Sequence, residues 1–267
     1  NGDEESSLLS REDSIAIFST KISVDKSFQD ALVQTFIRLS AQANWRALHE
    51  VTLYKATLYD SINYSWLMMA CVTGEKELVK KILSLSNAPL NTKSMTEAHP
   101  LYLATLFRQK EVVECLLNHP NIDLSLVQSK TGATVFFIAC QLSSDEIVGL
   151  YLNNPKIHEL INYPDFMGLR PIHVSIVENR KSVFDLLLTK LDHLDLNCVD
   201  EDKKSALHYL CIHNRFEMLE QFCGLPGINF ELKDAYDRTP FMCACDGGHF
   251  DVARHLYEKY HVNINQV

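Results

Sequence analysis

The sequence predicts an all-α solenoid, in which similar pairs of helices stack one after another along the chain. Three observations lead to this fold class: a short block that recurs at a nearly constant interval, apolar stripes with helical spacing after each block, and turn-forming residues between the units. The chain has 267 residues, of which 46% are hydrophobic. It is therefore long enough and apolar enough to build a sizeable core.

A seven-residue block recurs six times along the chain. The blocks begin at Ser65, His99, Thr134, Arg170, Ser205 and Thr239. Successive starts are 34, 35, 36, 35 and 34 residues apart. This regularity is typical of repeat proteins, in which each unit buries its apolar face only against its neighbours.

An apolar stripe follows each block and predicts a second helix in every unit. In the fourth unit, for example, Phe184, Leu187 and Leu188 have the i, i+3, i+4 spacing of one helix face. The units tend to close on Asn and to reopen on Asp, as Asn197 and Asp200 do. Both residue types tolerate left-handed backbone and bond their own main chain, so we expect turns at these positions.

These blocks resemble the ankyrin repeat, whose motif reads Thr-Pro-Leu-His-x-Ala. The match is best from Asp234 to Asn263, where Thr239 and Pro240 are followed by Gly248 and His249. The resemblance implies a hairpin, a helix, a turn and a second helix in each unit. We predict six such repeats, at 60–93, 94–128, 129–164, 165–199, 200–233 and 234–267.

Some units depart from the family pattern at the turn between their two helices. The residues that stand in place of the family's glycine are Arg108, Ser143, Asn179 and Asn214. These departures leave the fold prediction intact but put the local turn geometry in question.

The repeat pattern weakens before residue 60. We predict a mostly flexible segment at 1–26 and a helical cap or degenerate repeat at 27–59, because stacked repeats need an end unit with a polar outer face. At the other end the chain stops directly after a well-formed repeat. We interpret the chain as a fragment of a longer protein.

Composition excludes several classes of function. The chain has 25 basic and 34 acidic residues and a net charge of -9, which disfavours nucleic acid as a partner. Its longest apolar stretch, 64–73, is far shorter than the roughly 18 residues of a membrane helix. No signal pattern opens the sequence and no CxxC pair occurs among the eight cysteines. We therefore expect an intracellular, cytoplasmic chain with reduced thiols and no membrane insertion.

Two groupings of histidine and cysteine raise the possibility of a metal site. They are His208, Cys211, His213 and Cys243, Cys245, His249. A zinc site needs four convergent ligands, usually at paired short spacings, and neither group has that pattern. The resemblance instead implies that His173 and His208 bond backbone at helix starts and that His249 belongs to the inter-helix turn. We predict no metal, no cofactor and no catalytic residue, although Cys211 beside a histidine leaves enzyme activity as an alternative.

The resemblance implies that a partner binds on the concave side of the stack. The predicted anchors there are Val72, Leu106, Phe107, Leu142, Val177, Ile212 and His213. The predicted acidic rim at the hairpin loops is Asp165, Asp200, Asp202 and Asp237. A basic or amphipathic protein segment would complement this surface. Two alternatives remain: residues 1–26 occupy the groove, or the apolar positions are simply buried between repeats.

Two functions of different classes follow from these features. The first is a non-catalytic, monomeric protein-interaction module that acts as a scaffold or adaptor, since preformed grooves lower the ordering cost of binding. The second is the regulatory or substrate-docking arm of a larger enzyme or channel.

Overall fold

The computed structural model describes residues 66–84, 88–94 and 97–263. These residues belong to one compact unit, Tyr64–Val267. The flexible segment predicted at 1–26 and the cap predicted at 27–59 lie outside the described residues, as does the possible occupation of the groove by residues 1–26.

The described α-helices form six successive pairs. We call the first helix of each pair the inner helix: α4 (Trp66–Thr73), α6 (Pro100–Leu106), α8 (Val135–Leu142), α10 (Pro171–Val177), α12 (Ala206–Ile212) and α14 (Pro240–Asp246). The second is the outer helix: α5 (Lys76–Leu83), α7 (Lys110–Leu117), α9 (Asp145–Leu152), α11 (Lys181–Leu188), α13 (Phe216–Cys223) and α15 (Phe250–Tyr260). One 3-10 helix, η1 (Pro155–Glu159), follows α9.

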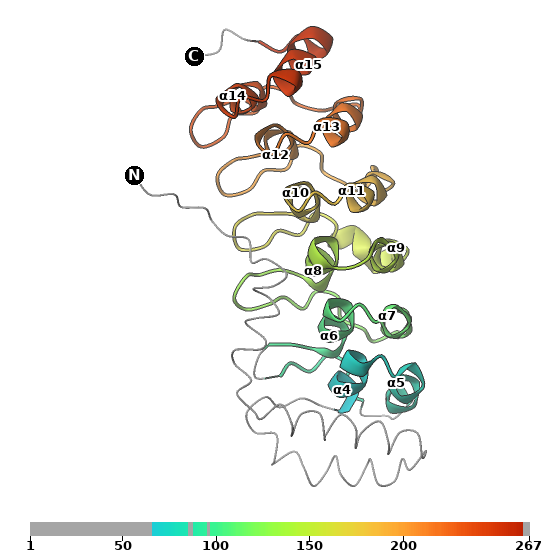
Figure 1. Ribbon diagram of the computed structural model, residues 1–267. Helices are drawn as coiled ribbons and strands as arrows, with labels where there is room; N and C mark the ends of the chain where they lie inside the picture. Colours follow the sequence, from blue (N-terminus) through green and yellow to red (C-terminus); the bar gives the residue numbers. More distant parts are fainter. Residues whose placement is uncertain (1–65, 85–87, 95–96, 264–267) are drawn as a thin grey trace, which may run out of the picture. The chain divides into compact units, whose positions relative to one another are not determined.

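The helix pairs form two layers, with the inner helices in one and the outer helices in the other (Figure 1). Each inner helix packs against its own outer helix and against the inner helices of neighbouring pairs. In the described part of the chain the only β structure is two isolated bridges, Val127 with Thr134 and Val199 with Ser205. The predicted all-α solenoid is confirmed.

Four of the inner helices, α6, α8, α12 and α14, begin at residues whose side chains cap a free backbone N–H group of the first turn. Thr134 Oγ1 accepts a hydrogen bond from the backbone N–H of Phe137 at 3.1 Å, and Thr239 caps α14 in the same way. Pro100, Pro171 and Pro240 stand at the first helical position. Proline suits this position because its missing N–H would have no helical partner there.

Buried histidines join the start of an inner helix to the next hairpin. His173 Nδ1 accepts the backbone N–H of Arg170 at 3.3 Å, and His173 Nε2 lies 3.2 Å from the carbonyl oxygen of Cys198. His208 makes the equivalent pair of contacts in the following repeat, with Ser205 and Arg238. The implied role of both histidines as backbone-bonding residues at helix starts agrees with these contacts.

Five of the inter-helix turns have left-handed backbone, whichever residue supplies it. Gly74 and Gly248 have φ values of 80° and 70°, and the non-glycine residues Arg108, Asn179 and Asn214 have φ values of 58°, 53° and 52°. Asparagine tolerates this region better than most residues. At Arg108, Asn179 and Asn214 the departure from glycine therefore changes the residue but keeps the turn, whereas Ser143, with φ -87°, does not adopt it.

Side chains at the start of the outer helices bond the inner helix of the preceding repeat. Gln109 Nε2 donates to the carbonyl of Val72 at 2.9 Å, and Arg215 Nη2 donates to the carbonyl of Val177 at 3.1 Å. His249 Nε2 lies 3.1 Å from the last carbonyl of α12. These bonds satisfy carbonyl groups that a helix end leaves free, so they tie each repeat to the next.

The core lies between the two layers and between successive repeats. Phe184 of α11 and Phe222 of α13 are fully buried, with ring centroids 6.0 Å apart. Phe136 of α8 packs on Tyr151 of α9, whose hydroxyl oxygen lies 2.6 Å from Thr105 Oγ1 of the preceding repeat. Because these contacts cross from one repeat to another, each repeat depends on its neighbours for burial.

Candidate protein-interaction surface

The ends of the inner helices carry the side chains that were predicted as partner anchors. We call the residues Val72, Leu106, Phe107, Val177, Ile212 and His213 the inner-helix surface. Phe107 is 43% exposed and the other five are partly exposed. His213 stacks parallel to Tyr209, with centroids 6.1 Å apart, and burial lowers the pKa of His213, with Arg215 adding to the effect. At neutral pH this histidine is therefore an uncharged hydrogen-bonding group.

Leu142 is buried at 8% exposure, unlike the other predicted anchors. The turn that follows α8 differs from the others, because Ser143 has φ -87° and ψ 174° instead of left-handed backbone. Arginines from both sides hold this turn: Arg108 donates to the carbonyl of Leu142, and Arg180 donates to the carbonyls of Gln141 and Ser143. We therefore leave Leu142 out of the inner-helix surface.

The tips of the hairpin loops are joined to one another by main-chain hydrogen bonds. The backbone N–H of Phe166 donates to Thr131 at 2.7 Å, that of Glu201 to Met167 at 3.0 Å, and that of Ala235 to Asp202 at 2.7 Å. Figure 1 shows these loops stacked on one side of the inner helices. The tips are thus a preformed surface, and a partner would not have to order them.

Close packing between the tips explains why glycine stands at positions 132 and 168. A Cβ atom on Gly168, whose φ is 75°, would lie 2.7 Å from the backbone nitrogen of Glu201. A Cβ atom on Gly132 would lie 2.4 Å from the ring of Phe166. Only glycine fits both the left-handed backbone and the space at these points.

Two of the four predicted rim aspartates brace the hairpins. Asp165 Oδ1 accepts the backbone N–H groups of Met167 and Leu169, both at 2.9 Å. Asp200 is only 9% exposed and accepts the backbone N–H of Lys204 at 2.8 Å. Burial raises the pKa of Asp165, and the nearby acidic residues of the next hairpin raise it further, against the effect of its hydrogen bonds. Both carboxylates therefore accept hydrogen bonds from the backbone of their own hairpins.

The other two rim aspartates, Asp202 and Asp237, are exposed at the tips. Asp202 forms an ion pair with Lys204 at 2.9 Å. Glu201 is exposed beside them. The acidic character that was predicted for the rim is therefore carried by Glu201, Asp202 and Asp237.

Large apolar side chains at the tips are the feature that the sequence analysis missed. Phe166, Met167 and Tyr236 are 58%, 50% and 70% exposed. We call Phe166, Met167, Glu201, Asp202, Tyr236 and Asp237 the hairpin-tip surface. The available signal was the placement of phenylalanine, methionine and tyrosine in turn segments, where polar residues are the usual choice. Side chains of this size exposed at a loop tip are a common mark of interaction sites.

A shallow depression of about 370 Å³ lies near the end of α12, beside Ile212 of the inner-helix surface. It is lined by Lys204, Ile212, Arg238, Cys243, Asp246 and Gly247. Arg238 forms ion pairs with Asp234 at 2.8 Å and with Asp246 at 3.3 Å, and its guanidinium lies 5.2 Å from the ring centre of Tyr236. Because both cations of the depression are paired with carboxylates, it offers no free charge for an anion.

The cysteines have the properties of packed side chains. All eight are free, and six of them are buried. Burial is the main cause that raises the pKa of each thiol, to about 12 for Cys198 and about 11 for Cys243. A cysteine nucleophile or metal ligand needs the opposite shift. The two ring nitrogens of His208 are taken by backbone contacts, so that histidine does not activate Cys211.

The residues that the structure describes contain neither a cluster of metal ligands nor a membrane-spanning helix. No group of three or more His, Cys, Asp and Glu side chains converges there as a metal site would require. None of the described helices has the length and apolar character needed to cross a bilayer, and the longest, α15, has 11 residues.

A family model for ankyrin repeats (3 copies) matches residues 67–162 and 191–267. The matched segments together make up more than half of the 267-residue chain. The chain belongs to the ankyrin repeat family. Ankyrin repeats are generally protein–protein interaction modules without catalytic activity, so the two surfaces described above belong to a fold whose partners are proteins.

Proteins similar to this chain include ones from rat, yeast and chicken. The rat nuclear factor NF-kappa-B p105 subunit is 32% identical over 148 residues, 54% of this chain and 15% of the rat protein. The probable 26S proteasome regulatory subunit p28 of Saccharomyces cerevisiae is 26% identical over 195 residues, 73% of this chain and 84% of the yeast protein. The chicken p105 subunit is 28% identical over 170 residues, 61% of this chain and 17% of the chicken protein. The chain thus spans a small part of the p105 subunits and most of p28.

Proposed function

We propose that this chain is a non-catalytic interaction module, a scaffold or adaptor that holds a segment of a partner protein against its inner-helix and hairpin-tip surfaces. The observation that carries the proposal is the exposure of Phe166, Met167 and Tyr236 on hairpin tips that main-chain hydrogen bonds hold in place. Aromatic side chains on a rigid support are the usual centres of binding energy in protein interfaces.

The chemistry of the tips favours a partner segment with basic and apolar residues. Glu201, Asp202 and Asp237 lie among the apolar side chains, and Lys204 neutralises only Asp202 within the described residues. Lysine or arginine of the partner would meet these carboxylates while its apolar residues contact Phe166 and Tyr236. The eight free cysteines suit a reducing compartment, and we place this interaction in the cytoplasm.

The alternative, a regulatory or docking arm within a larger protein, draws support from the short share of the p105 subunits that the chain covers. The likeness to the yeast p28, over 84% of that protein, supports instead a separate chain that serves a larger assembly. The same binding surfaces serve both roles. The two therefore differ in what the module is attached to, not in how it binds.

Affinity capture with a variant tests the proposal. Phe166→Ser, Met167→Ser and Tyr236→Ser together remove the exposed apolar groups of the tips and keep Gly132, Gly168 and the main-chain bonds. We expect this triple variant to keep the helical circular-dichroism signal and to lose the partners that the unchanged protein captures. A matched control changes the exposed Leu191 and Tyr163 to Ser. Capture of the same partners by the triple variant would refute the proposal.

A further inference from the structure

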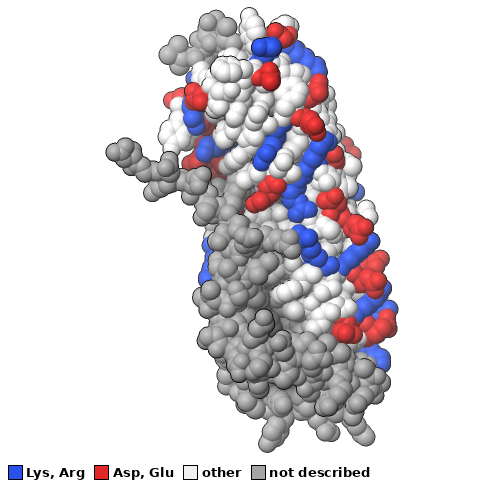
Figure 2. All heavy atoms as spheres, viewed as in Figure 1, with Lys and Arg blue, Asp and Glu red and all other residues white. Residues whose placement is uncertain are grey.

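The outer helices α5, α7, α9 and α11 start with charged residues, three of which pair between repeats. Their first residues are Lys76, Lys110, Asp145 and Lys181. Ion pairs join Lys76 to Glu111 at 3.3 Å, Lys110 to Glu146 at 2.8 Å, and Asp145 to Arg180 at 3.6 Å. Figure 2 shows acidic and basic side chains alternating along this side of the molecule. This part of the outer face is a solvated and internally neutralised surface.

The last two outer helices start with phenylalanine instead. Phe216 of α13 is 37% exposed and Phe250 of α15 is 73% exposed. Phe216 stays exposed although α15 packs beside α13, so the position remains open when a further repeat is stacked on it. The outer face of these two repeats therefore replaces paired charges with accessible aromatic rings.

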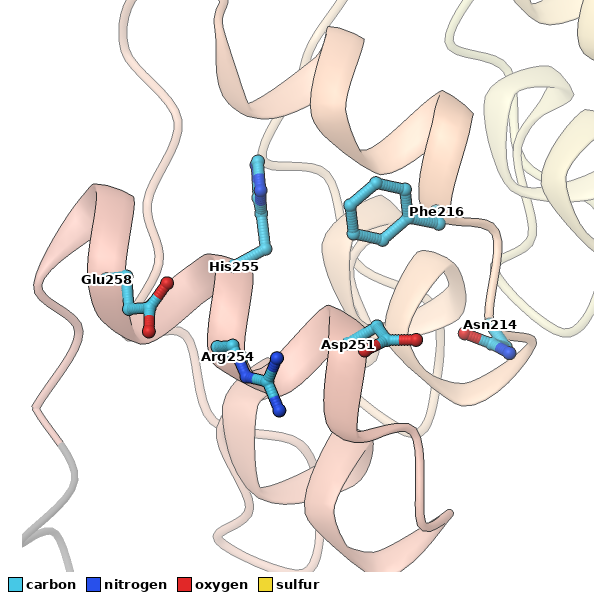
Figure 3. Close-up of a pocket in the computed structure, with 6 residues that line it drawn as sticks. All are labelled: Asn214, Phe216, Asp251, Arg254, His255 and Glu258. Carbon is cyan, nitrogen blue, oxygen red and sulfur yellow. The ribbon is translucent and has the colours of Figure 1, made fainter.

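A depression of about 430 Å³ lies beside Phe216, between α13 and α15. Figure 3 shows its lining: Asn214 in the turn before α13, Phe216 at the start of α13, and Asp251, Arg254, His255 and Glu258 on α15. We call these six residues the outer groove. The ring of His255 meets the ring of Phe216 edge-on, with centroids 5.3 Å apart, and its Nε2 atom is buried without a hydrogen-bond partner.

The charges of the outer groove are unpaired, in contrast to those of the early repeats. Asp251 and Glu258 lie two helical turns apart on α15, and neither takes part in an ion pair within the described residues. Glu217, exposed on α13 next to Phe216, is also outside the ion pairs of this region, whereas Lys259 is held by Glu220 at 3.7 Å. Arg254 is the one cation in the groove lining. The carboxylates therefore outnumber it, and the ring of Phe216 lines the same groove (Figure 3).

We propose that the outer groove binds an arginine or lysine side chain on a basic segment of a partner protein. The aliphatic stem of the cation would lie on Phe216, where the ring face attracts a positive charge, and its charged end would meet Asp251 or Glu258. Arginine fits better than lysine because its planar guanidinium both stacks on a ring and bonds a carboxylate. The outer groove belongs to the outer-helix layer, so this site is separate from the inner-helix and hairpin-tip surfaces and does not rest on them.

A pair of short peptides tests this site on the full chain. A fluorescently labelled, end-blocked peptide of alternating arginine and leucine is titrated with the protein at physiological salt and followed by anisotropy, and a glutamate–leucine twin serves as its counterpart. We expect saturable binding of the arginine peptide only. Binding that is absent up to about 1 mM protein, or that favours the glutamate peptide, would overturn the proposal.

Matched variants locate the binding. Asp251→Asn with Glu258→Gln should weaken binding of the arginine peptide about fivefold or more. Phe216→Ser, which removes the aromatic ring of the groove, should also weaken it. Glu114→Gln with Glu159→Gln removes the same charge from exposed positions in earlier repeats and should change the affinity less than twofold. Equal weakening in this control would mean non-specific attraction to an acidic protein. Weakening by Asp202→Asn with Asp237→Asn, but not by the groove variant, would assign the peptide to the hairpin-tip surface and refute the outer groove.

Discussion

The buried ring of His173 predicts a specific loss of stability in mild acid. Its Nδ1 accepts a hydrogen bond from Arg170 and its Nε2 faces the carbonyl of Cys198, so the neutral ring with a proton on Nε2 fits both contacts. Burial, with Arg170 adding to the effect, lowers the pKa of His173 to about 3. In the unfolded chain the pKa of histidine is about 6.5.

The sign and size of the effect follow from this difference. Below pH 6.5 the unfolded chain binds a proton at His173, whereas the folded chain stays neutral until about pH 3. The free energy of unfolding therefore decreases as the pH is lowered across this window, by up to about 1.4 kcal/mol per pH unit. Between pH 7 and pH 5 the loss is about 2 kcal/mol. His99, whose pKa burial lowers to about 4, adds a similar loss in the second repeat.

Urea unfolding of His173→Gln measures the contribution. Glutamine does not titrate, and its amide can still donate to the Cys198 carbonyl. We expect the variant to be less stable than the unchanged protein at pH 7 but to lose about 2 kcal/mol less between pH 7 and pH 5. Exposed Leu191 supplies the control, since Leu191→Gln introduces the same amide without removing a titratable group and should leave the pH dependence unchanged. Equal losses in the unchanged protein and in His173→Gln would refute the reasoning.

Three further predictions concern the tips, the turn after α8 and the thiols. Gly168→Ala should cost more than about 2 kcal/mol in urea unfolding, because it adds a backbone clash to left-handed strain, whereas Gly227→Ala, at φ 82° with open space, should cost only about 1 kcal/mol. Arg180→Ala should cost about 2–4 kcal/mol by leaving two carbonyls without their donor, and Arg180→Lys less. In native protein a thiol reagent should modify exposed Cys245 before the buried cysteines and no faster than an unperturbed thiol, because burial raises the pKa of Cys245 as well; a faster-reacting buried cysteine would contradict the packing argument.

Much of the fold could be predicted because the same sequence pattern recurs in six units. The spacing of the blocks predicts the number of helix pairs, and helical spacing within a unit predicts outer helices such as α11. The turns also agree with the prediction, since Asn179 and Asn214 adopt the left-handed backbone at the position where the family usually has glycine. Each of these features depends on residues close together in the sequence.

The interaction surfaces could be predicted only in part. Phe107 and Ile212 lie accessible at inner-helix ends, as expected, but Leu142 is buried beside a turn that two arginines from neighbouring repeats hold. Asp200 braces a hairpin instead of facing a partner. The position of a residue within its repeat did not reveal these outcomes, because they depend on side chains more than 30 residues away or on the path of a loop.

The sequence by itself determined the repeat, the helix pairs and the acidic balance, because these are set by local spacing and composition, whereas the role of the histidines followed from the resemblance to the family. Tertiary structure alone decided which side chains remain exposed. Stacking brings Phe166 and Tyr236 onto one row of hydrogen-bonded tips, and it leaves the ring of Phe216 open beside unpaired carboxylates. The exposure of a side chain depends on the neighbouring repeats as well as its own, because each repeat covers part of the next.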